Sequence, residues 1–113
     1  MKKTIILGVC CPLERTVEII GDRWVALILR ELFLKGPRRF QDFNESLPSV
    51  SPNVLSGRLK KLLEQDIVCS KLYSDHPPRN DYHLTAKGQQ LGKIISGMRD
   101  WGKEFTSYKS ESD

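Results

Sequence analysis

The residues best placed to do chemistry are two adjacent cysteines near the N-terminus, Cys10 and Cys11, which directly precede Pro12. Proline is favoured at the first position of a helix, where its missing amide hydrogen leaves no hydrogen bond unmade. Cys11 therefore stands at the start of a predicted helix, where free amides and the helix dipole favour the thiolate form of a cysteine. Arg15, one turn on, adds a positive charge. The pattern favours a reactive thiol.

A structural interpretation of these residues stays open, because free cysteine often packs as a small buried hydrophobe. A disulfide between the neighbours Cys10 and Cys11 would be strained, and Cys69 lies in a predicted strand with no clear role as a resolving thiol. The cysteines, His76 and His83 show no paired ligand spacing, so the sequence predicts no metal site and no cofactor. Both histidines lie far along the chain from Cys11. A thiol enzyme therefore lacks an obvious catalytic base, and the sequence favours a protein that is not an enzyme.

The bulk composition is that of one ordinary globular domain. The 113 residues are 39% hydrophobic and 28% charged, which argues against both disorder and a membrane protein. The apolar run after the N-terminal lysines, residues 5–9, is too short for a signal peptide, so the sequence predicts a cytoplasmic protein with no membrane partner. The net charge is +4, and between Lys35 and Lys87 nine Lys or Arg face six Asp or Glu. This basic excess permits a polyanionic partner.

Helix caps, breakers and apolar periodicity predict five helices and a β-hairpin. Asp22 and Ser51-Pro52 are start signals, and Gly36-Pro37 is a stop signal. The elements come in the order helix 12–20, helix 23–34, a short helix with Phe40, Phe43 and Leu47 on one face, helix 52–65, strand 67–73, strand 80–84 and helix 85–108. Two helices joined by a tight turn and followed by a hairpin predict a mainly α fold with a small β-hairpin and a helix-turn-helix. The sequence predicts that all of these helices and strands belong to one domain, residues 1–113.

The predicted helix 52–65 has an apolar side and a free polar side. At about 100° per residue, Val54, Leu55 and Leu59 fall on one arc, which is the core side. The opposite side is short, polar and mildly basic, as a helix in a DNA major groove requires. Any amphipathic surface helix also has a solvated side, so both interpretations stay open. Arg58 falls on the core side, which predicts a structural ion pair rather than base reading.

Residues on either side of this helix extend the candidate DNA surface. Arg38 and Arg39, at the entrance of the preceding helix, are placed to contact phosphates. The stiff Pro77-Pro78 turn holds Arg79 ready for an adjacent minor groove. Each feature is also typical of a solvated turn. The candidate DNA-binding residues are Arg38, Arg39, Ser51, Pro52, Asn53, Ser56, Gly57, Lys60, Lys61, His76 and Arg79.

The last predicted helix, 85–108, carries more apolar surface than one small domain is expected to cover. Its apolar residues keep a heptad rhythm, which is typical of helices that pack against a partner. We expect a second copy of the chain to cover them, while packing back on the chain's own core is the alternative. The candidate dimer residues are Leu13, Val17, Leu91, Ile94, Ile95, Met98, Trp101 and Phe105.

Taken together, these stretches resemble the HxlR-type winged helix-turn-helix transcriptional regulators, relatives of the MarR group found in bacteria and archaea. The matching pieces are CPLERTVEIIGDRW, LILREL, GPRRFQDF, LPSVSPNVLSGRLKKL and PPRNDYHLTAKG, with the late Trp101. They occur in family order from Cys11 to about Trp101. Jointly they are specific, although each alone would be weak.

The resemblance implies a homodimeric repressor or activator of transcription that binds double-stranded DNA. Its DNA-binding core would span about 11–88, with N- and C-terminal dimerisation helices, helix 52–65 in the major groove and a wing at about 74–80 near the minor groove. In some members the cysteine at the position of Cys11 senses electrophiles or oxidants, which makes Cys11 and Cys10 candidate sensor thiols. Many members carry longer polar or charged side chains where Pro52, Asn53 and Gly57 stand, so the resemblance does not imply a base contact from each of these positions.

Several properties are left open by the sequence. They are the operator, the target genes, the sign of regulation, the effector, and which residues of helix 52–65 read bases rather than phosphates. A winged-helix module that binds protein without specific DNA binding is the main alternative. DNA affinity that falls steeply with salt would favour the regulator, because phosphate neutralisation releases counterions.

Overall fold

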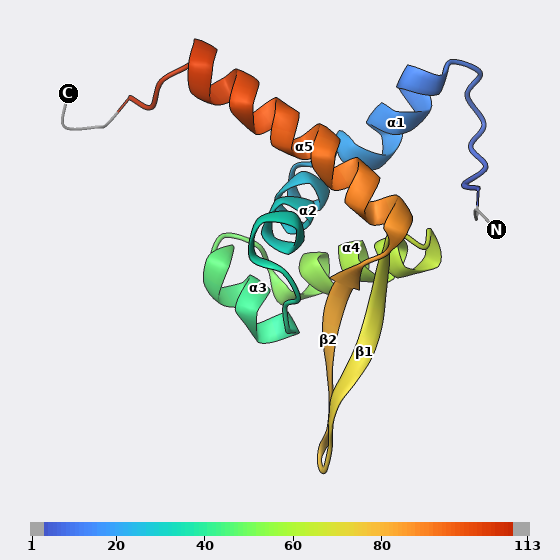
Figure 1. Ribbon diagram of the computed structural model, residues 1–113, viewed down its shortest axis with the longest axis vertical. Coiled ribbons are helices and arrows are strands. Elements are labelled where there is room, and N and C mark those ends of the chain that lie inside the picture. Colours follow the sequence, from blue (N-terminus) through green and yellow to red (C-terminus); the bar gives the residue numbers. More distant parts are fainter. Residues whose placement is uncertain (1–3, 110–113) are drawn as a thin grey trace.

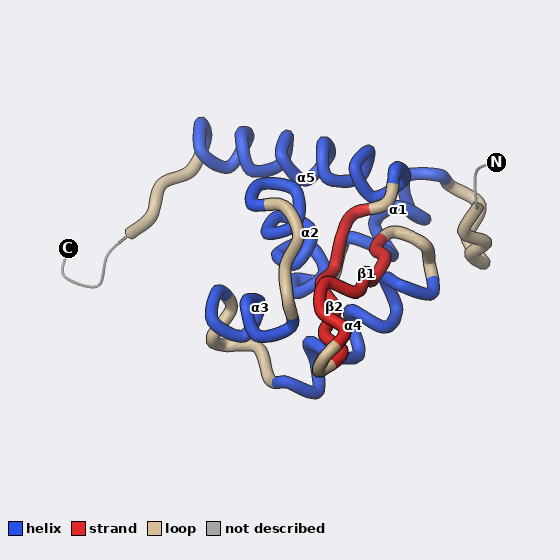
Figure 2. The backbone as a smooth tube through the Cα atoms, turned by 60° about the horizontal axis from the view of Figure 1, so that its bottom comes forward, coloured by secondary structure: helices blue, strands red, loops and turns tan. Residues whose placement is uncertain are grey.

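The computed structural model describes residues 4–109 (Figures 1 and 2). Its first two helices begin where the sequence predicts them. Helix α1, Pro12–Ile20, starts at its proline. Helix α2, Arg23–Lys35, starts after Asp22, whose Oδ1 accepts hydrogen bonds from two backbone N–H groups of the first turn. It ends at Gly36, whose φ of 84° lies in the left-handed region that glycine adopts most easily.

Helices α3, Phe40–Ser46, and α4, Pro52–Glu64, form the predicted helix-turn-helix (Figure 1). At the start of α3 the Asp42 carboxylate accepts the backbone N–H of Arg39 at 2.9 Å. At the start of α4 the Oγ of Ser51 accepts a backbone N–H of the first turn at 3.2 Å. Such caps stabilise a helix by about 1 kcal/mol each. Both helices end within one residue of the predicted ends.

Strands β1, Val68–Asp75, and β2, Pro78–Leu84, form one antiparallel hairpin that projects from the body as a wing (Figure 1). The predicted hairpin is confirmed, but its strands run further than expected. Pairing continues to Asp75 opposite Pro78, so only His76 and Pro77 form the turn. The sequence suggested a longer turn because proline cannot donate to a strand ladder, yet at the end of a strand it is tolerated.

A backbone bridge ties the wing to the loop before α3. The N–H of Arg38 donates to the carbonyl oxygen of Tyr82 at 3.1 Å, and the N–H of Tyr82 donates to the carbonyl oxygen of Arg38 at 2.7 Å. The ring of Tyr82 also lies against that of Phe43 in α3, with 6.1 Å between centroids. Backbone and side chain together therefore fix the base of the wing against the helix-turn-helix.

Helix α5, Ala86–Phe105, lies across α2 (Figure 2). Its cap is Thr85, whose Oγ1 accepts the N–H of Gly88 at 3.0 Å and donates to the carbonyl oxygen of Asp66 at 2.6 Å. A Cβ placed on Gly88 would lie 2.1 Å from the carbonyl oxygen of Ile67, and one on Gly92 would lie 2.3 Å from the Phe33 ring. The absence of side chains at these two positions lets α5 approach the body closely.

One hydrophobic core lies between the helices and the base of the wing. Its buried side chains are Ile20, Val25, Ile28, Leu29, Leu32, Phe43, Leu47, Val50, Leu55, Leu59, Leu62, Ile67, Val68 and Ile95. Ile95 is only 6% exposed, and Leu91 packs half-buried against the same core. The prediction that Ile95 belongs to a dimer stripe is therefore wrong, and Leu91 serves the protomer's own core, because the side of α5 that carries both faces α2.

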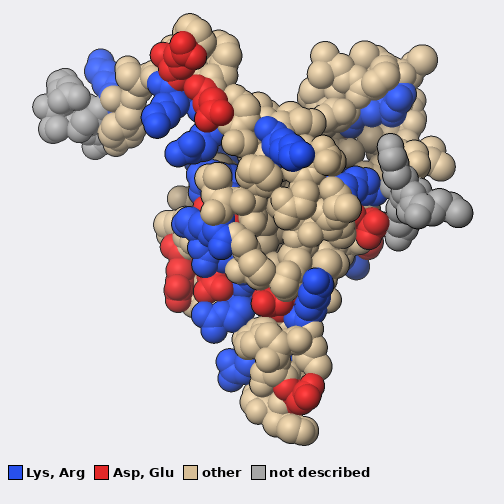
Figure 3. Space-filling model, viewed as in Figure 1, with Lys and Arg blue, Asp and Glu red and all other residues tan. Residues whose placement is uncertain are grey.

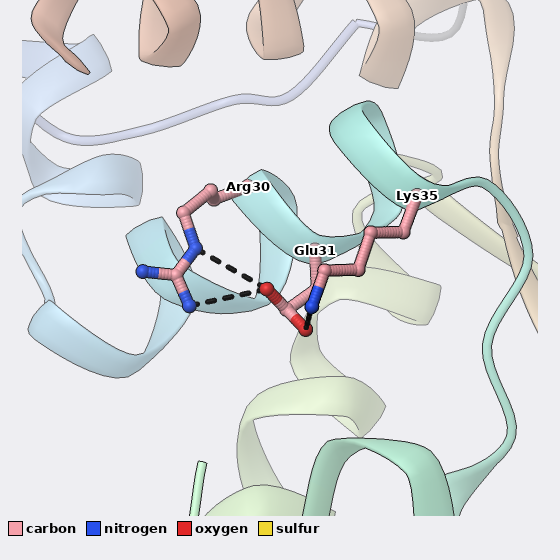
Figure 4. Close-up of polar contacts among 3 residues, drawn as sticks. All are labelled: Arg30, Glu31 and Lys35. Carbon is pink, nitrogen blue, oxygen red and sulfur yellow. Dashed lines mark hydrogen bonds and ion pairs between the residues drawn. The ribbon is translucent and has the colours of Figure 1, made fainter. Parts of the chain in front are cut away.

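A buried carboxylate in α2 is a feature that the apolar pattern of this helix did not predict. Glu31 is 2% exposed, with Nη2 of Arg30 at 3.1 Å and Nζ of Lys35 at 3.2 Å from its oxygens (Figure 4). Burial pushes the pKa of this carboxyl up, but hydrogen bonds from Ser46 and the two cations outweigh burial and bring the pKa below its ordinary value. Glu31 therefore ties α2 to the end of α3 as an ion.

Replacing Glu31 by glutamine is expected to lower the free energy of unfolding at pH 7 by about 1–3 kcal/mol, because a charge-assisted buried network is lost. Since the folded pKa lies below the unfolded one, the ion contributes its full stability above about pH 5 and loses it as the pH falls through the folded pKa. Urea unfolding at neutral pH and near pH 3.5 measures both effects. The wild type should lose more stability on acidification than Glu31→Gln, and an equal loss would contradict this role.

Candidate nucleic-acid interface

Helix α4 presents its polar side to solvent, as predicted. Leu55, Leu59 and Leu62 are buried on the opposite side. The exposed residues at the start of α4 and along its free side are Ser51, Pro52, Asn53, Ser56, Gly57, Lys60 and Lys61. This side combines hydrogen-bond donors and acceptors with two cations and no large apolar group, which is the chemistry that base edges and phosphates require.

Gly57 leaves the middle of this free side without a side chain. A Cβ added there would meet nothing within 4 Å, so packing inside the protomer does not require a glycine. Glycine inside a helix costs about 1 kcal/mol relative to alanine. A glycine with this cost and no internal packing reason favours close approach of the α4 backbone to a ligand outside the protomer.

Arg58 points away from this free side and joins α4 to α2. Its Nε donates to Oδ2 of Asp22 at 2.8 Å, while Oδ1 of Asp22 caps α2. Burial pushes the pKa of Asp22 up, but the N–H of Val25 and the Arg58 guanidinium outweigh it, so the pKa lies below its ordinary value. The predicted structural ion pair of Arg58 is confirmed. It holds α4 at a fixed place relative to α2 and the core.

Arg58→Ala is expected to lower the free energy of unfolding by about 0.5–1 kcal/mol, a modest loss because both side chains of the pair are about one third exposed. DNA affinity of the folded protein should change little, since the side chain is engaged by Asp22. Thermal unfolding and a gel shift on the same preparation measure the two effects. An unchanged melting temperature together with lost DNA binding would instead make Arg58 a DNA-reading residue.

The two arginines before α3 have different partners. Nε and Nη2 of Arg39 donate to the Asp42 carboxylate at 3.2 and 3.1 Å. Asp42, and the Tyr73 side chain of β1, raise the pKa of Arg39 above its ordinary value. Nε of Arg38 is buried and finds no acceptor in the part of the chain that the structure describes. Any phosphate contact of Arg39 must therefore share the guanidinium with an existing ion pair.

The far end of the wing carries His76 and Arg79, both exposed. Figure 1 places the hairpin turn at one extreme of the molecule, well away from α5. Over the face shown in Figure 3, basic and acidic side chains alternate and no large field of one sign is present. On that face, any nucleic-acid contact would therefore rest on individual cations rather than on a broad field of positive charge.

The two N-terminal cysteines are exposed, so the interpretation of this pair as buried hydrophobes is wrong. Cys11 is the N-cap of α1, with no hydrogen bond from its side chain to the helix. Nη1 of Arg15 donates to the carbonyl oxygens of Val9 and Cys10, at 3.0 and 2.5 Å. Arg15 thus binds the backbone of the cysteine segment and holds that segment against α1.

Within residues 4–109 no group of three His, Cys, Asp or Glu side chains is arranged to hold a metal ion. No helix there is long and apolar enough to span a bilayer. The third cysteine, Cys69, is half-buried in β1.

Four apolar side chains form an exposed stripe along the outer side of α5. They are Ile94, Met98, Trp101 and Phe105, between 49% and 64% exposed. Leu13 and Val17 of α1 are 71% and 51% exposed. In Figure 1, α1 and the C-terminal half of α5 both lie at the end of the molecule opposite the wing. Apolar surface of this extent is typical of a protein–protein interface.

The fold is a helix-turn-helix with a projecting hairpin and a C-terminal helix that carries an exposed apolar stripe. The family model for the HxlR-like helix-turn-helix matches residues 19–110. This chain belongs to the HxlR family. The match begins after most of α1, so the cysteine pair lies outside the matched residues of this HxlR protein.

Related HxlR-type proteins are named as transcriptional regulators. YvaP of Bacillus subtilis, an HTH-type transcriptional regulator, is 40% identical over 96 residues, which cover 84% of this chain and 88% of YvaP. The redox regulator HypR, solved in its oxidized form, superposes with a TM-score of 0.79 at 31% identity over 87% of this chain and 100% of HypR. Diamide-treated YodB from B. subtilis superposes with a TM-score of 0.70 at 30% identity over 90% of this chain and 100% of YodB. The predicted winged helix-turn-helix fold is confirmed.

Three residues that hold the helices of this HxlR protein in place could have been found from weak signals in the sequence. Glu31 interrupts an apolar helix and stands four residues before Lys35, a spacing at which opposite charges meet on one face. Gly88 and Gly92 stand four residues apart near the start of α5, so they share a side of the helix. That spacing of small residues is a sign of close helix approach that periodicity of apolar residues alone does not reveal.

Proposed function

We propose that this HxlR protein is a sequence-specific, DNA-binding transcriptional regulator that acts as a homodimer in the cytoplasm and is not an enzyme. The observation that carries the proposal is the free polar side of α4, which lies beside an anchored wing. Helix α4 enters the major groove, where Asn53, Ser56 and Lys60 face base edges and the adjoining phosphates. The wing brings Arg79 and His76 toward the neighbouring minor groove.

The remaining candidates take supporting roles at this interface. Ser51 and Pro52 bring the first turn of α4 to the DNA backbone, and Gly57 lets the helix approach without obstruction. Lys61 and Arg38 neutralise phosphates. Arg39 contacts a phosphate only where the phosphate competes with the Asp42 carboxylate for its guanidinium.

The dimer forms through the exposed stripe of α5, with Leu13 and Val17 of α1 beside it. Because these residues lie at the end opposite the wing, a partner that covers them leaves α4 and the wing free in both subunits. Helix-turn-helix dimers place their two recognition helices in successive major grooves, about 34 Å apart. The proposed operator is therefore a site with two-fold related halves.

Cys11, with Cys10 beside it, serves in this proposal as a sensor of electrophiles or oxidants. Both thiols are exposed, and Arg15 links their backbone to the helix that carries the dimer residues Leu13 and Val17. The relatives support a role of this protein in sensing oxidants, since HypR is described as a redox regulator and YodB was solved after diamide treatment. Modification at Cys11 would thus act on dimer geometry and, through it, on DNA binding.

The experiment that tests the function is a gel shift on DNA upstream of the protein's own gene, run across a salt series and before and after treatment with a quinone or diamide. Specific binding that weakens steeply with salt supports the regulator. Loss of that binding on treatment, with retention in Cys11→Ser, supports the sensor. Salt-insensitive capture of a protein partner without DNA binding would favour a winged-helix interaction module instead.

Lys60→Ala and Arg79→Ala are each expected to weaken DNA binding about 5- to 10-fold. Each should also make the slope of log affinity against log salt shallower, by about one phosphate contact per subunit of the dimer. Both side chains are exposed, so the melting temperature should stay within about 1–2 °C of the wild type. Lys103→Ala, an exposed lysine near the end of α5, is the control and should bind DNA normally. Normal binding by both test variants would remove α4 and the wing from the interface.

A further inference from the structure

A cleft lies where the end of α1, the start of α2 and one side of α4 meet. We call it the α4 cleft, because Gly57, Arg58, Lys61 and Leu62 of that helix form half of its lining. Its volume is about 280 Å³. Sites for small molecules typically span about 300–1,000 Å³, so the size of the α4 cleft suits only a small ligand.

One part of the lining is an apolar wall to which three helices contribute. The wall consists of Ile19 from α1, Val25 from α2 and Leu62 from α4. Val25 and Leu62 belong to the buried core, so the wall is held in place before any ligand binds. Gly57 adds no side chain, and a Cβ there would meet nothing within 4 Å. The α4 side of the cleft is therefore open to a ligand.

The polar part of the lining presents hydrogen-bond donors that the protein itself does not use. The Arg58 guanidinium binds Asp22 through Nε, and its two Nη groups donate no hydrogen bond within residues 4–109. Over the same residues, the exposed Lys61 ammonium and the half-buried Gln65 side-chain amide form no hydrogen bond or ion pair. These three groups line the same cleft as the apolar wall.

Asp22, the carboxylate in this lining, is already engaged. Its Oδ1 accepts the N–H groups of Trp24 and Val25, and its Oδ2 accepts Nε of Arg58 at 2.8 Å. Two cations and one carboxylate leave the lining with an excess of positive charge. Since the free polar atoms are mainly donors, the cleft favours an anion with several acceptor atoms. A carboxylate has two acceptor oxygens that match the fork of a guanidinium.

We propose that the α4 cleft binds a small organic acid, which has one carboxylate and an apolar ring or short chain. The carboxylate lies between the Nη groups of Arg58 and the Nζ of Lys61, with a hydrogen bond from the amide of Gln65. The apolar body of the ligand covers the apolar wall. Because Gly57 and Lys61 also belong to the candidate DNA surface, the ligand lies at the edge of that surface. Binding of the ligand itself does not rest on the proposed function.

The test is an NMR titration of the full, isotope-labelled chain with benzoate in the absence of DNA. Backbone amide signals of residues 19–25 and 57–65 should shift and saturate, which gives a dissociation constant. Lys61→Ala should raise this constant at least about threefold, because a charge-assisted contact is lost. Lys60→Ala is the matched control, since it removes the same charge from the next residue of α4 but lies outside the lining. It should bind benzoate like the parent.

Two further ligands separate the two parts of the site in the parent protein. Benzamide has the ring without the charge, and inorganic phosphate has the charge without an apolar body. Each should bind at least about tenfold more weakly than benzoate, because each lacks one of the two contributions. This comparison needs no variant, so it holds even where a variant is unstable.

Four results would overturn the proposal. They are no saturable shift with benzoate, shifts confined to α5, equal benzoate affinity of Lys61→Ala and Lys60→Ala, and binding of benzamide or phosphate as tight as that of benzoate. A gel shift without specific DNA binding would count against the proposed function and would leave the benzoate result unchanged.

Discussion

Gly88→Ala is expected to lower the free energy of unfolding by about 3 kcal/mol or more. The added Cβ would lie 2.1 Å from the carbonyl oxygen of Ile67, a backbone atom that cannot rotate away as the end of a side chain can. Helix α5 must then move off the base of the wing, and the hydrogen bond from the Gly88 N–H to Thr85 is strained with it.

Thermal unfolding measures this effect as a fall in melting temperature of about 10–15 °C for a domain of this size. Gly97→Ala is the matched control in the same helix, because a Cβ there would meet nothing within 4 Å. That change should leave stability unchanged or raise it by up to about 1 kcal/mol through helix propensity. A similar melting temperature for both variants would show that α5 does not approach Ile67 as closely as described.

Trp101→Ala is expected to weaken the proposed homodimer by at least about 30-fold, which corresponds to about 2 kcal/mol. Its indole is 63% exposed in the protomer and lies 5.5 Å from the ring of Phe105, in the middle of the exposed stripe. Large aromatic side chains at the centre of an interface contribute most of its binding energy. Because the same side chain is exposed in the single subunit, the fold of the subunit should be preserved.

Sedimentation across a concentration series measures the dimer dissociation constant of Trp101→Ala against the wild type. Leu34→Ala is the control, since Leu34 is 49% exposed but lies on α2, outside the stripe. That variant should dimerise normally. A dimer that is unaltered in Trp101→Ala would exclude the α5 stripe as the contact, while dissociation of both variants would point to a more extended interface.

Local signals explain why so much of the fold could be predicted. Asp22, Ser51 and Thr85 each accept a hydrogen bond from a backbone N–H of the helix that follows, so each helix start is set by neighbours in the chain. The two sides of α4 follow from helical periodicity, which places Leu55 inside and Lys60 outside without reference to any distant residue. The wing was also identifiable from local signals, because two short strand-like runs flank a proline turn.

Contacts between distant segments explain what could not be predicted. Apolar periodicity gave α5 one continuous stripe, but α2 covers Ile95 and leaves Trp101 exposed, and only the position of α2 separates the two. The pairing of Cys69 with His83 depends on a two-residue turn and on a register irregularity between Leu72 and Ser74. A shift of one residue in that register would place each side chain opposite a different partner.

The sequence by itself determined the order of helices and strands, the free polar side of α4 and the family, because caps, periodicity and motifs are local in the chain. The tertiary structure decided which residues are buried and which ions are paired. The Glu31 carboxylate is stabilised as an ion partly by a hydrogen bond from Ser46 at the end of α3. Arg58 is a structural residue because its Nε lies 2.8 Å from the Asp22 carboxylate. Such roles depend on distances between segments far apart in sequence, which no local pattern encodes.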